Sequence, residues 1–187
     1  VIHYSTSMWD DDYTGREMPA QQFSINPKTH SYHNNRIIFN IMKNTKQIQL
    51  SEHFSLREMT ASGTAMQLNI DNTPDEAQTE CLRNLCQQVL EPLRKRFGVI
   101  RVTSGFRSKR LNNAVGGVIC SQHLLGEAAD LHISNMEVGR KMYDYIRNNL
   151  DFDQLLFEHR MANGCIWLHV SYTKRHPNRH DARPVYL

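Results

Sequence analysis

Two histidines and an aspartate stand at spacings that would let them bind one metal ion. His123 precedes Asp130 by seven residues in the segment SQHLLGEAAD, and His169 lies in the segment WLHVS. Two imidazole nitrogens and one carboxylate oxygen, with a fourth position left to water, are a ligand set of catalytic zinc, whereas structural zinc sites are closed by four protein ligands. A zinc site is therefore one interpretation of these three residues.

The sequence around each of these residues favours a strand or a turn that would aim it at the others. Alternation puts Trp167, His169 and Ser171 on one face of a strand, with aliphatic residues on the other face. Gly126 permits a turn between loop and strand. Asp130 would then lie on a buried strand, where an unpaired carboxylate is costly and zinc is a suitable partner.

Each residue taken alone also has an ordinary structural explanation. A single histidine on a strand, such as His169, is usually a hydrogen-bonded polar residue. Asp130 could cap a helix or pair with a basic side chain. The pattern by itself leaves these alternatives open.

The composition is that of an ordinary globular domain. The 187 residues are 40% apolar and 22% charged, and the four cysteines form no C-x-x-C pair, which disfavours a cysteine zinc site. The net charge of +3 would suit a polyanion, but a solvated surface explains it equally well, and we expect no nucleic-acid partner. No apolar run nears the roughly 20 residues that span a bilayer, and the first residues lack a signal-peptide pattern.

Three segments differ in their patterns. We expect a partly irregular N-terminal extension over 1–46, a folded domain over 47–175 and a C-terminal tail over 176–187, with residues from 174 onward irregular. Helices and strands mix without strict alternation, which indicates the α+β class. The predicted helices begin at Ser55 and span 74–97 and 137–149, the predicted strands span 99–103, 128–133, 152–157 and 166–172, and 60–73 is a predicted loop.

The longest predicted helix has signals at both ends. Thr73 is the expected N-cap and Pro74 the first helical residue. Apolar residues recur at intervals of three and four, and Gly98 ends the pattern. Pro92 should kink or break this helix.

Several spaced motifs resemble the zinc D-Ala-D-Ala carboxypeptidase family, which includes phage-borne cell-wall endopeptidases. They are SxHxxGxAxD from Ser121, WxHxS from Trp167, the arginine motif SGFRS from Ser104 and DQLLFE from Asp153. The resemblance covers about residues 48–175. It implies a central antiparallel sheet flanked by helices, in the hedgehog/DD-peptidase-like fold.

The resemblance also implies roles for particular residues. Arg107 would be a catalytic and substrate-binding residue, because a guanidinium fork suits a peptide carboxylate. Ser121 and Gln122 would bind substrate or orient ligands, or would simply shape the turn. One zinc ion would be held by His123, Asp130 and His169.

The group that transfers the proton is the open point of such a mechanism. Zinc lowers the pKa of a bound water to about 7, and a general base should take the water's proton and return it to the leaving amine. Several family members carry an acid three residues before the last histidine, where this chain has Ile166. Glu158 is the candidate base, with a solvated strand end as the alternative reading. His159 could stabilise the oxyanion, His132 could support Asp130 from the same strand face, and Glu127 is expected to be solvated.

The sequence thus predicts a zinc metallopeptidase that hydrolyses peptide bonds of bacterial peptidoglycan, as a D-Ala-D-Ala carboxypeptidase or as a stem or cross-bridge endopeptidase. The alternative is a non-catalytic, zinc-containing cell-wall-binding or phage structural protein, which the missing acid favours. We expect a monomer without a transmembrane segment. If the chain is phage-derived, we expect cytoplasmic synthesis and endolysin-like action at the cell wall.

Overall fold

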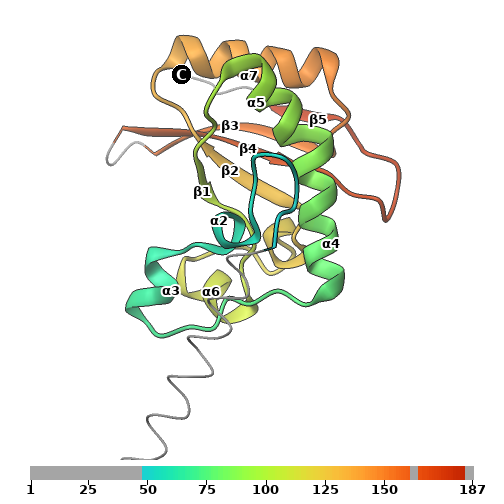
Figure 1. The fold of residues 1–187 in the computed structure, drawn as a ribbon. Helices are drawn as coiled ribbons and strands as arrows, with labels where there is room; N and C mark the ends of the chain where they lie inside the picture. The colour runs from blue at the N-terminus through green and yellow to red at the C-terminus, as the bar shows by residue number, and fades with distance from the viewer. Residues whose placement is uncertain (1–47, 161–163, 184–187) are drawn as a thin grey trace, which may run out of the picture. The chain divides into compact units, whose positions relative to one another are not determined.

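Five strands form one mixed sheet in the computed structural model, which describes residues 48–160 and 164–183. Their spatial order is β1-β2-β4-β3-β5 (Figure 1). The neighbours among β1 to β4 pair antiparallel, and β5 joins β3 in parallel at the edge. The strands are β1 (Val102–Ser104), β2 (Ala128–His132), β3 (Gln154–Arg160), β4 (Cys165–Ser171) and β5 (Asp181–Arg183).

The register of the central strands gives this sheet one apolar face and one polar face. Asp130 of β2 lies opposite His169 of β4, and Leu131 lies opposite Leu168. Opposed residues point to the same face and successive residues alternate, so the two polar residues share one face and the two leucines share the other. Both leucines are fully buried in the main core. The polar face is therefore the one that carries the site.

Helices bury the apolar face. Helix α7 packs on β3 and β4 and lies beside α5 (Figure 1). Leu82, Val89 and Ile146 join the strand leucines in one core. The helical segments are α2 (Leu56–Thr60), α3 (Gly63–Gln67), α4 (Glu76–Leu85), the π-helical η1 (Cys86–Leu90), α5 (Glu91–Phe97), α6 (Lys109–Ala114), the 3-10 helix η2 (Gln122–Leu125) and α7 (Met136–Asn149).

The long predicted helix begins two residues later than expected. The N-cap is Asp75, whose side chain accepts a hydrogen bond from the Gln78 amide while the Gln78 side chain accepts one from the Asp75 amide. Thr73 is not the cap, because its hydroxyl donates to Asp71 at 2.6 Å. The predicted break near Pro92 is confirmed: the helix passes through η1 before it continues as α5.

Two elements arise where the sequence predicted irregular chain. Helix α3 lies within the predicted loop, and the Ser62 side chain caps it by accepting a hydrogen bond from the Ala65 amide. Strand β5 lies in the predicted irregular tail. This segment forms a strand because it pairs with β3, where Gln154 lies opposite Asp181. A three-residue strand made by a distant partner carries no periodic signal of its own.

The α+β class is confirmed, with β5 as a parallel addition to an otherwise antiparallel sheet. Across residues 48–160 and 164–183, no helix has the length and apolar character to cross a membrane. The predicted N-terminal extension, 1–46, lies outside the described residues. Its boundary and that of the tail stay predictions.

Candidate metal centre

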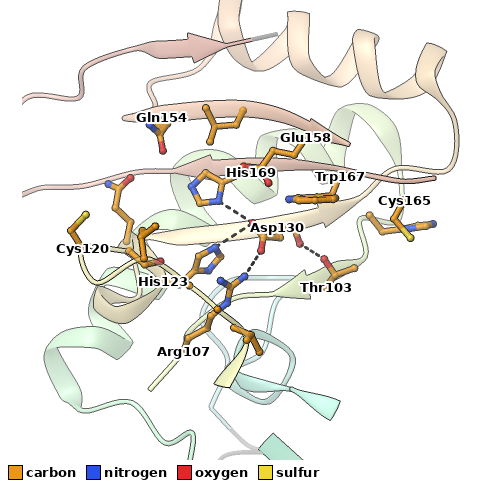
Figure 2. A pocket seen from close by; sticks show the side chains of 18 of the residues that line it. Thr103, Arg107, Cys120, His123, Asp130, Gln154, Glu158, Cys165, Trp167 and His169 are labelled. Atoms are coloured by element: carbon orange, nitrogen blue, oxygen red, sulfur yellow. Dashed lines mark hydrogen bonds and ion pairs between the residues drawn. The ribbon is translucent and has the colours of Figure 1, made fainter. Parts of the chain in front are cut away.

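His123, Asp130 and His169 converge on the polar face of the sheet (Figure 2). Oδ1 of Asp130 lies 3.2 Å from Nε2 of His123 and 2.9 Å from Nδ1 of His169. One potential ligand atom from each residue lies within 4.8 Å of the other two. The three side chains that the sequence analysis singled out are thus brought together by the fold.

The position of His123 is set by the turn that follows it and by a backbone carbonyl. Gly126 ends η2 in the left-handed region at φ 72°, and a Cβ there would collide with the carbonyl oxygen of Gln78. Nδ1 of His123 lies 2.6 Å from the carbonyl oxygen of Gly105. A carbonyl oxygen only accepts, so Nδ1 carries the proton and Nε2 keeps its lone pair for a metal.

The arginine segment is tied to the same histidine. The Arg107 amide donates to the carbonyl oxygen of His123 at 3.1 Å. The Arg107 side chain donates from Nη2 to Oδ2 of Asp130 at 2.5 Å and from Nε to the Ser104 hydroxyl at 2.7 Å. Arg107 therefore orients the carboxylate that faces both histidines.

The electrostatics favour the metal-binding forms of His123 and Asp130. Burial lowers the pKa of His123, which favours the neutral imidazole that ligates metals. Burial alone would raise the pKa of Asp130, but the nearby ring nitrogens of His123 and His169 outweigh burial and hold that pKa far below its usual range. Near neutral pH, His123 therefore offers a neutral ring nitrogen and Asp130 a carboxylate.

The cluster lies in a pocket of about 820 Å³ on the polar face of the sheet. Arg107, Ser121 and Gln122, the expected substrate-binding residues, all line it. Nε2 of Gln122 donates to Oδ2 of Asp153 at 2.9 Å, so this amide also braces the wall of the pocket. The pocket is large enough for a peptide segment, since ligand sites commonly span about 300–1,000 Å³.

Glu158, the candidate base, lines the same pocket. It lies opposite Trp167 in the β3–β4 pair, whereas Leu156 lies opposite His169. Glu158 and His169 are thus diagonal neighbours on one face, a relationship that separates Cα atoms by about 7–8 Å. Figure 2 shows the Glu158 side chain on the same side of the sheet as His169 and Trp167. Its role as a base stays a prediction.

Two of the remaining candidates have clear positions. His132 lines the pocket, but it is exposed and lies outside the cluster. Glu127 is not solvated as predicted. It is buried and accepts hydrogen bonds from Nε and Nη2 of Arg175, both at 2.7 Å, and from the Thr173 hydroxyl. The segment that follows β4 supplies these partners, and nothing in the local sequence around Glu127 points to them.

A second buried carboxylate is likewise paired with the tail. Asp153 is fully buried and accepts hydrogen bonds from Nε and Nη2 of Arg179, at 3.0 and 2.6 Å. Arg179 itself lines the pocket, which the sequence analysis missed. The sequence contained only a weak signal for these ion pairs. It consists of two arginines four residues apart, Arg175 and Arg179, and two acids far upstream, Glu127 and Asp153.

The donor set fits zinc. Two imidazole nitrogens and a carboxylate oxygen converge, one histidine is fixed in its tautomer by a carbonyl, and the carboxylate is oriented by an arginine. Two histidines and one carboxylate that converge in a pocket are the ligand set typical of metal-dependent hydrolases.

Comparison with known proteins identifies the family. Residues 52–170, well over half of the chain, match the family described as peptidase M15. The chain therefore belongs to the M15 family of zinc D-Ala-D-Ala carboxypeptidase-like enzymes, which are hydrolases acting on peptide bonds. The predicted resemblance is confirmed. No curated protein matches the chain.

Proposed function

We propose that the protein is a zinc metallopeptidase that hydrolyses peptide bonds of bacterial peptidoglycan, either as a D-Ala-D-Ala carboxypeptidase or as a stem or cross-bridge endopeptidase. The observation that carries the proposal is the convergence of His123, Asp130 and His169 in a pocket that can take a peptide. When bound, zinc supplies a Lewis acid that polarises the scissile carbonyl and lowers the pKa of a water to about 7.

The residues of this chain supply the rest of the chemistry. Glu158 takes the proton of the attacking water and returns it to the leaving amine. Arg107 keeps Asp130 in place and presents positive charge to the pocket beside the developing oxyanion. Ser121 and Gln122 border the path of the substrate, with Gln122 braced by Asp153.

Defined muropeptides, analysed by mass spectrometry with and without chelator, test this proposal. We expect one peptide bond to be cut, activity to be lost with chelator and restored by zinc, and His123→Ala to be inactive. Full activity of His123→Ala would contradict the proposal. The mass of the products also distinguishes removal of a terminal D-Ala from internal cleavage.

The variant Glu158→Gln separates the enzyme from a non-catalytic, zinc-containing wall protein. We expect kcat to fall by about 10²–10⁴-fold, the usual contribution of a general acid–base group, with zinc affinity unchanged. Zinc binding without cleavage of any muropeptide by the wild type would favour the non-catalytic alternative. Cleavage that is insensitive to Glu158→Gln would assign the base elsewhere.

A further inference from the structure

Arg179 lies in the tail, lines the pocket and is held by a buried carboxylate, that of Asp153. Its Nε and Nη2 donate to the two oxygens of Asp153, and its backbone amide donates to Oδ1 of the same residue at 3.1 Å. Asp153 is fully buried, whereas the Arg179 side chain is 55% exposed. The carboxylate therefore fixes one edge of the guanidinium and leaves the other end toward solvent and the pocket.

The free end of this guanidinium is suited to a ligand. Within residues 48–160 and 164–183, Nη1 of Arg179 has no hydrogen-bond acceptor. Nη1 and Nη2 form the second parallel pair of donors on a guanidinium, the geometry that binds a carboxylate through two hydrogen bonds. A guanidinium held by a buried acid loses little side-chain entropy when it binds.

The pocket differs in charge along strand β3. Gln154 and Glu158 both line the pocket and lie four residues, or about 13 Å, apart along the strand. Arg179 lies at the Gln154 end, because it is hydrogen-bonded to the adjacent Asp153. Leu156, between them, lies opposite His169. Figure 2 shows the same order, with Gln154 on one side of His169 and Trp167 on the other. A peptide lying across the metal cluster thus meets a cation at one end and an anion at the other.

Arg107 does not fill the same role at that end. Its Nε and Nη2 are committed to Ser104 and Asp130, and its side chain is only 17% exposed. Its positive charge lies against a predicted metal ligand. Arg179 is more exposed than Arg107, and its own partner, Asp153, is buried.

We propose that Arg179 binds a free carboxylate of the substrate peptide and so sets which bond lies over His123, Asp130 and His169. This inference rests on the proposed peptidase function. Peptidoglycan peptides offer such a group from two sources, the C-terminal carboxylate and the α-carboxylate of γ-linked D-glutamate. The chemistry of recognition is the same for both.

The test compares the zinc-loaded wild type with Arg179→Lys on peptide pairs that differ only in one carboxylate replaced by an amide. One pair changes the C-terminal carboxylate and the other the D-glutamate α-carboxylate. We expect the wild type to prefer the carboxylate in one pair by at least about tenfold in kcat/KM, because the amide leaves the guanidinium without its anion. In Arg179→Lys, we expect this preference to fall to about twofold or less.

Arg175→Lys is the matched control. Arg175 lies four residues before Arg179 and is 53% exposed. It also donates through Nε and Nη2 to a buried carboxylate, that of Glu127, but it does not line the pocket. Both lysine variants should lose similar thermal stability, and only Arg179→Lys should lose the carboxylate preference. An unchanged preference in Arg179→Lys, or an equal loss in Arg175→Lys, overturns the inference.

A binding measurement separates this inference from the peptidase proposal. If the wild type cuts none of the peptides, the peptidase function fails, and the affinities of the carboxylate and amide peptides for the same zinc-loaded protein are measured by calorimetry. Tighter binding of the carboxylate peptide, lost in Arg179→Lys and kept in Arg175→Lys, supports the subsite. Equal affinity of the wild type for both peptides overturns it.

Discussion

Arg107 holds one oxygen of Asp130 and leaves the other to the histidines. Nη2 of Arg107 lies 2.5 Å from Oδ2, while Oδ1 lies within 3.2 Å of a nitrogen of each histidine. One carboxylate is therefore both an expected metal ligand and the partner of a fixed cation. Such support of a ligand raises metal affinity by restricting the ligand to its binding orientation.

Arg107→Lys should weaken zinc binding. A lysine keeps the charge but lacks the rigid planar fork whose two nitrogens reach Ser104 and Asp130, so the carboxylate gains freedom. We expect zinc affinity to fall by about 10–100-fold, measured by competition with a chelator of known affinity. The control is Arg110→Lys, an exposed change on the neighbouring helix α6, and a similar loss in both variants would refute the specific role of Arg107.

Zinc should stabilise the fold through the two histidines. At a free zinc concentration 100 times Kd, binding adds about 2.7 kcal/mol to the free energy of unfolding. We expect zinc to raise Tm in the wild type and to have almost no effect in His123→Ala or His169→Ala, measured by calorimetry. His132→Ala is the control, since it lines the pocket outside the cluster. A normal response to zinc in His169→Ala would remove that residue from the ligand set.

Gly126→Ala should destabilise the protein more than Gly116→Ala does. Both glycines have positive φ, 72° and 75°, but only at Gly126 would a Cβ collide with backbone, at the carbonyl of Gln78. We expect a loss of about 2–4 kcal/mol for Gly126→Ala and about 1 kcal/mol for Gly116→Ala, from urea unfolding. Gly126→Ala should also reduce zinc affinity, because Gly126 ends the η2 turn that positions His123. Equal losses of stability would contradict the packing argument.

Asp153 should make the protein sensitive to acid. Burial would raise the pKa of this carboxyl, but hydrogen bonds from Arg179 and Gln122 outweigh burial and hold the pKa below its usual range. A lowered folded-state pKa gives stability that is present above the unfolded-state value of about 3.9 and is lost as pH falls through the folded-state value.

Asp153→Asn tests this dependence. We expect this variant to lower the free energy of unfolding at pH 7 by about 1–3 kcal/mol. The further decrease in the free energy of unfolding between pH 5 and pH 3 should be smaller than in the wild type, as measured by urea unfolding at each pH. Asp144→Asn, an exposed change on α7, should keep the wild-type pH dependence. A loss in Asp153→Asn that is as steep as in the wild type would show that other acids dominate.

Much of the site could be predicted because its residues lie in short motifs with local meaning. The segment from Ser121 to Asp130 contains one candidate metal ligand, a glycine that makes the turn and a strand that carries the second candidate ligand. Alternation in β4 placed His169 correctly on the polar face. The break before Pro92 was also predicted, because proline acts on its own helix.

One error has a local cause, and the other depends on a partner far along the chain. Thr73 was predicted as a cap, but the side chain of Asp71 takes its hydroxyl, and Asp75 caps the helix instead. Glu127 was predicted to be solvated, but its carboxylate is buried and pairs with Arg175, 48 residues later. Charge pairs of this kind have no periodic signature, because either partner alone looks like a surface residue.

The sequence by itself determined the residue types of the candidate metal centre, the strand that carries Asp130, the strand that carries His169 and the α+β class. These depend on residue chemistry and on periods of two and four residues, which act over short distances along the chain. Only the tertiary structure decided that Arg107 faces Asp130, that Glu158 is diagonal to His169 and that Arg179 enters the pocket on Asp153. Strand register and the path of the tail set those relationships, because both are chosen by the packing of the whole domain.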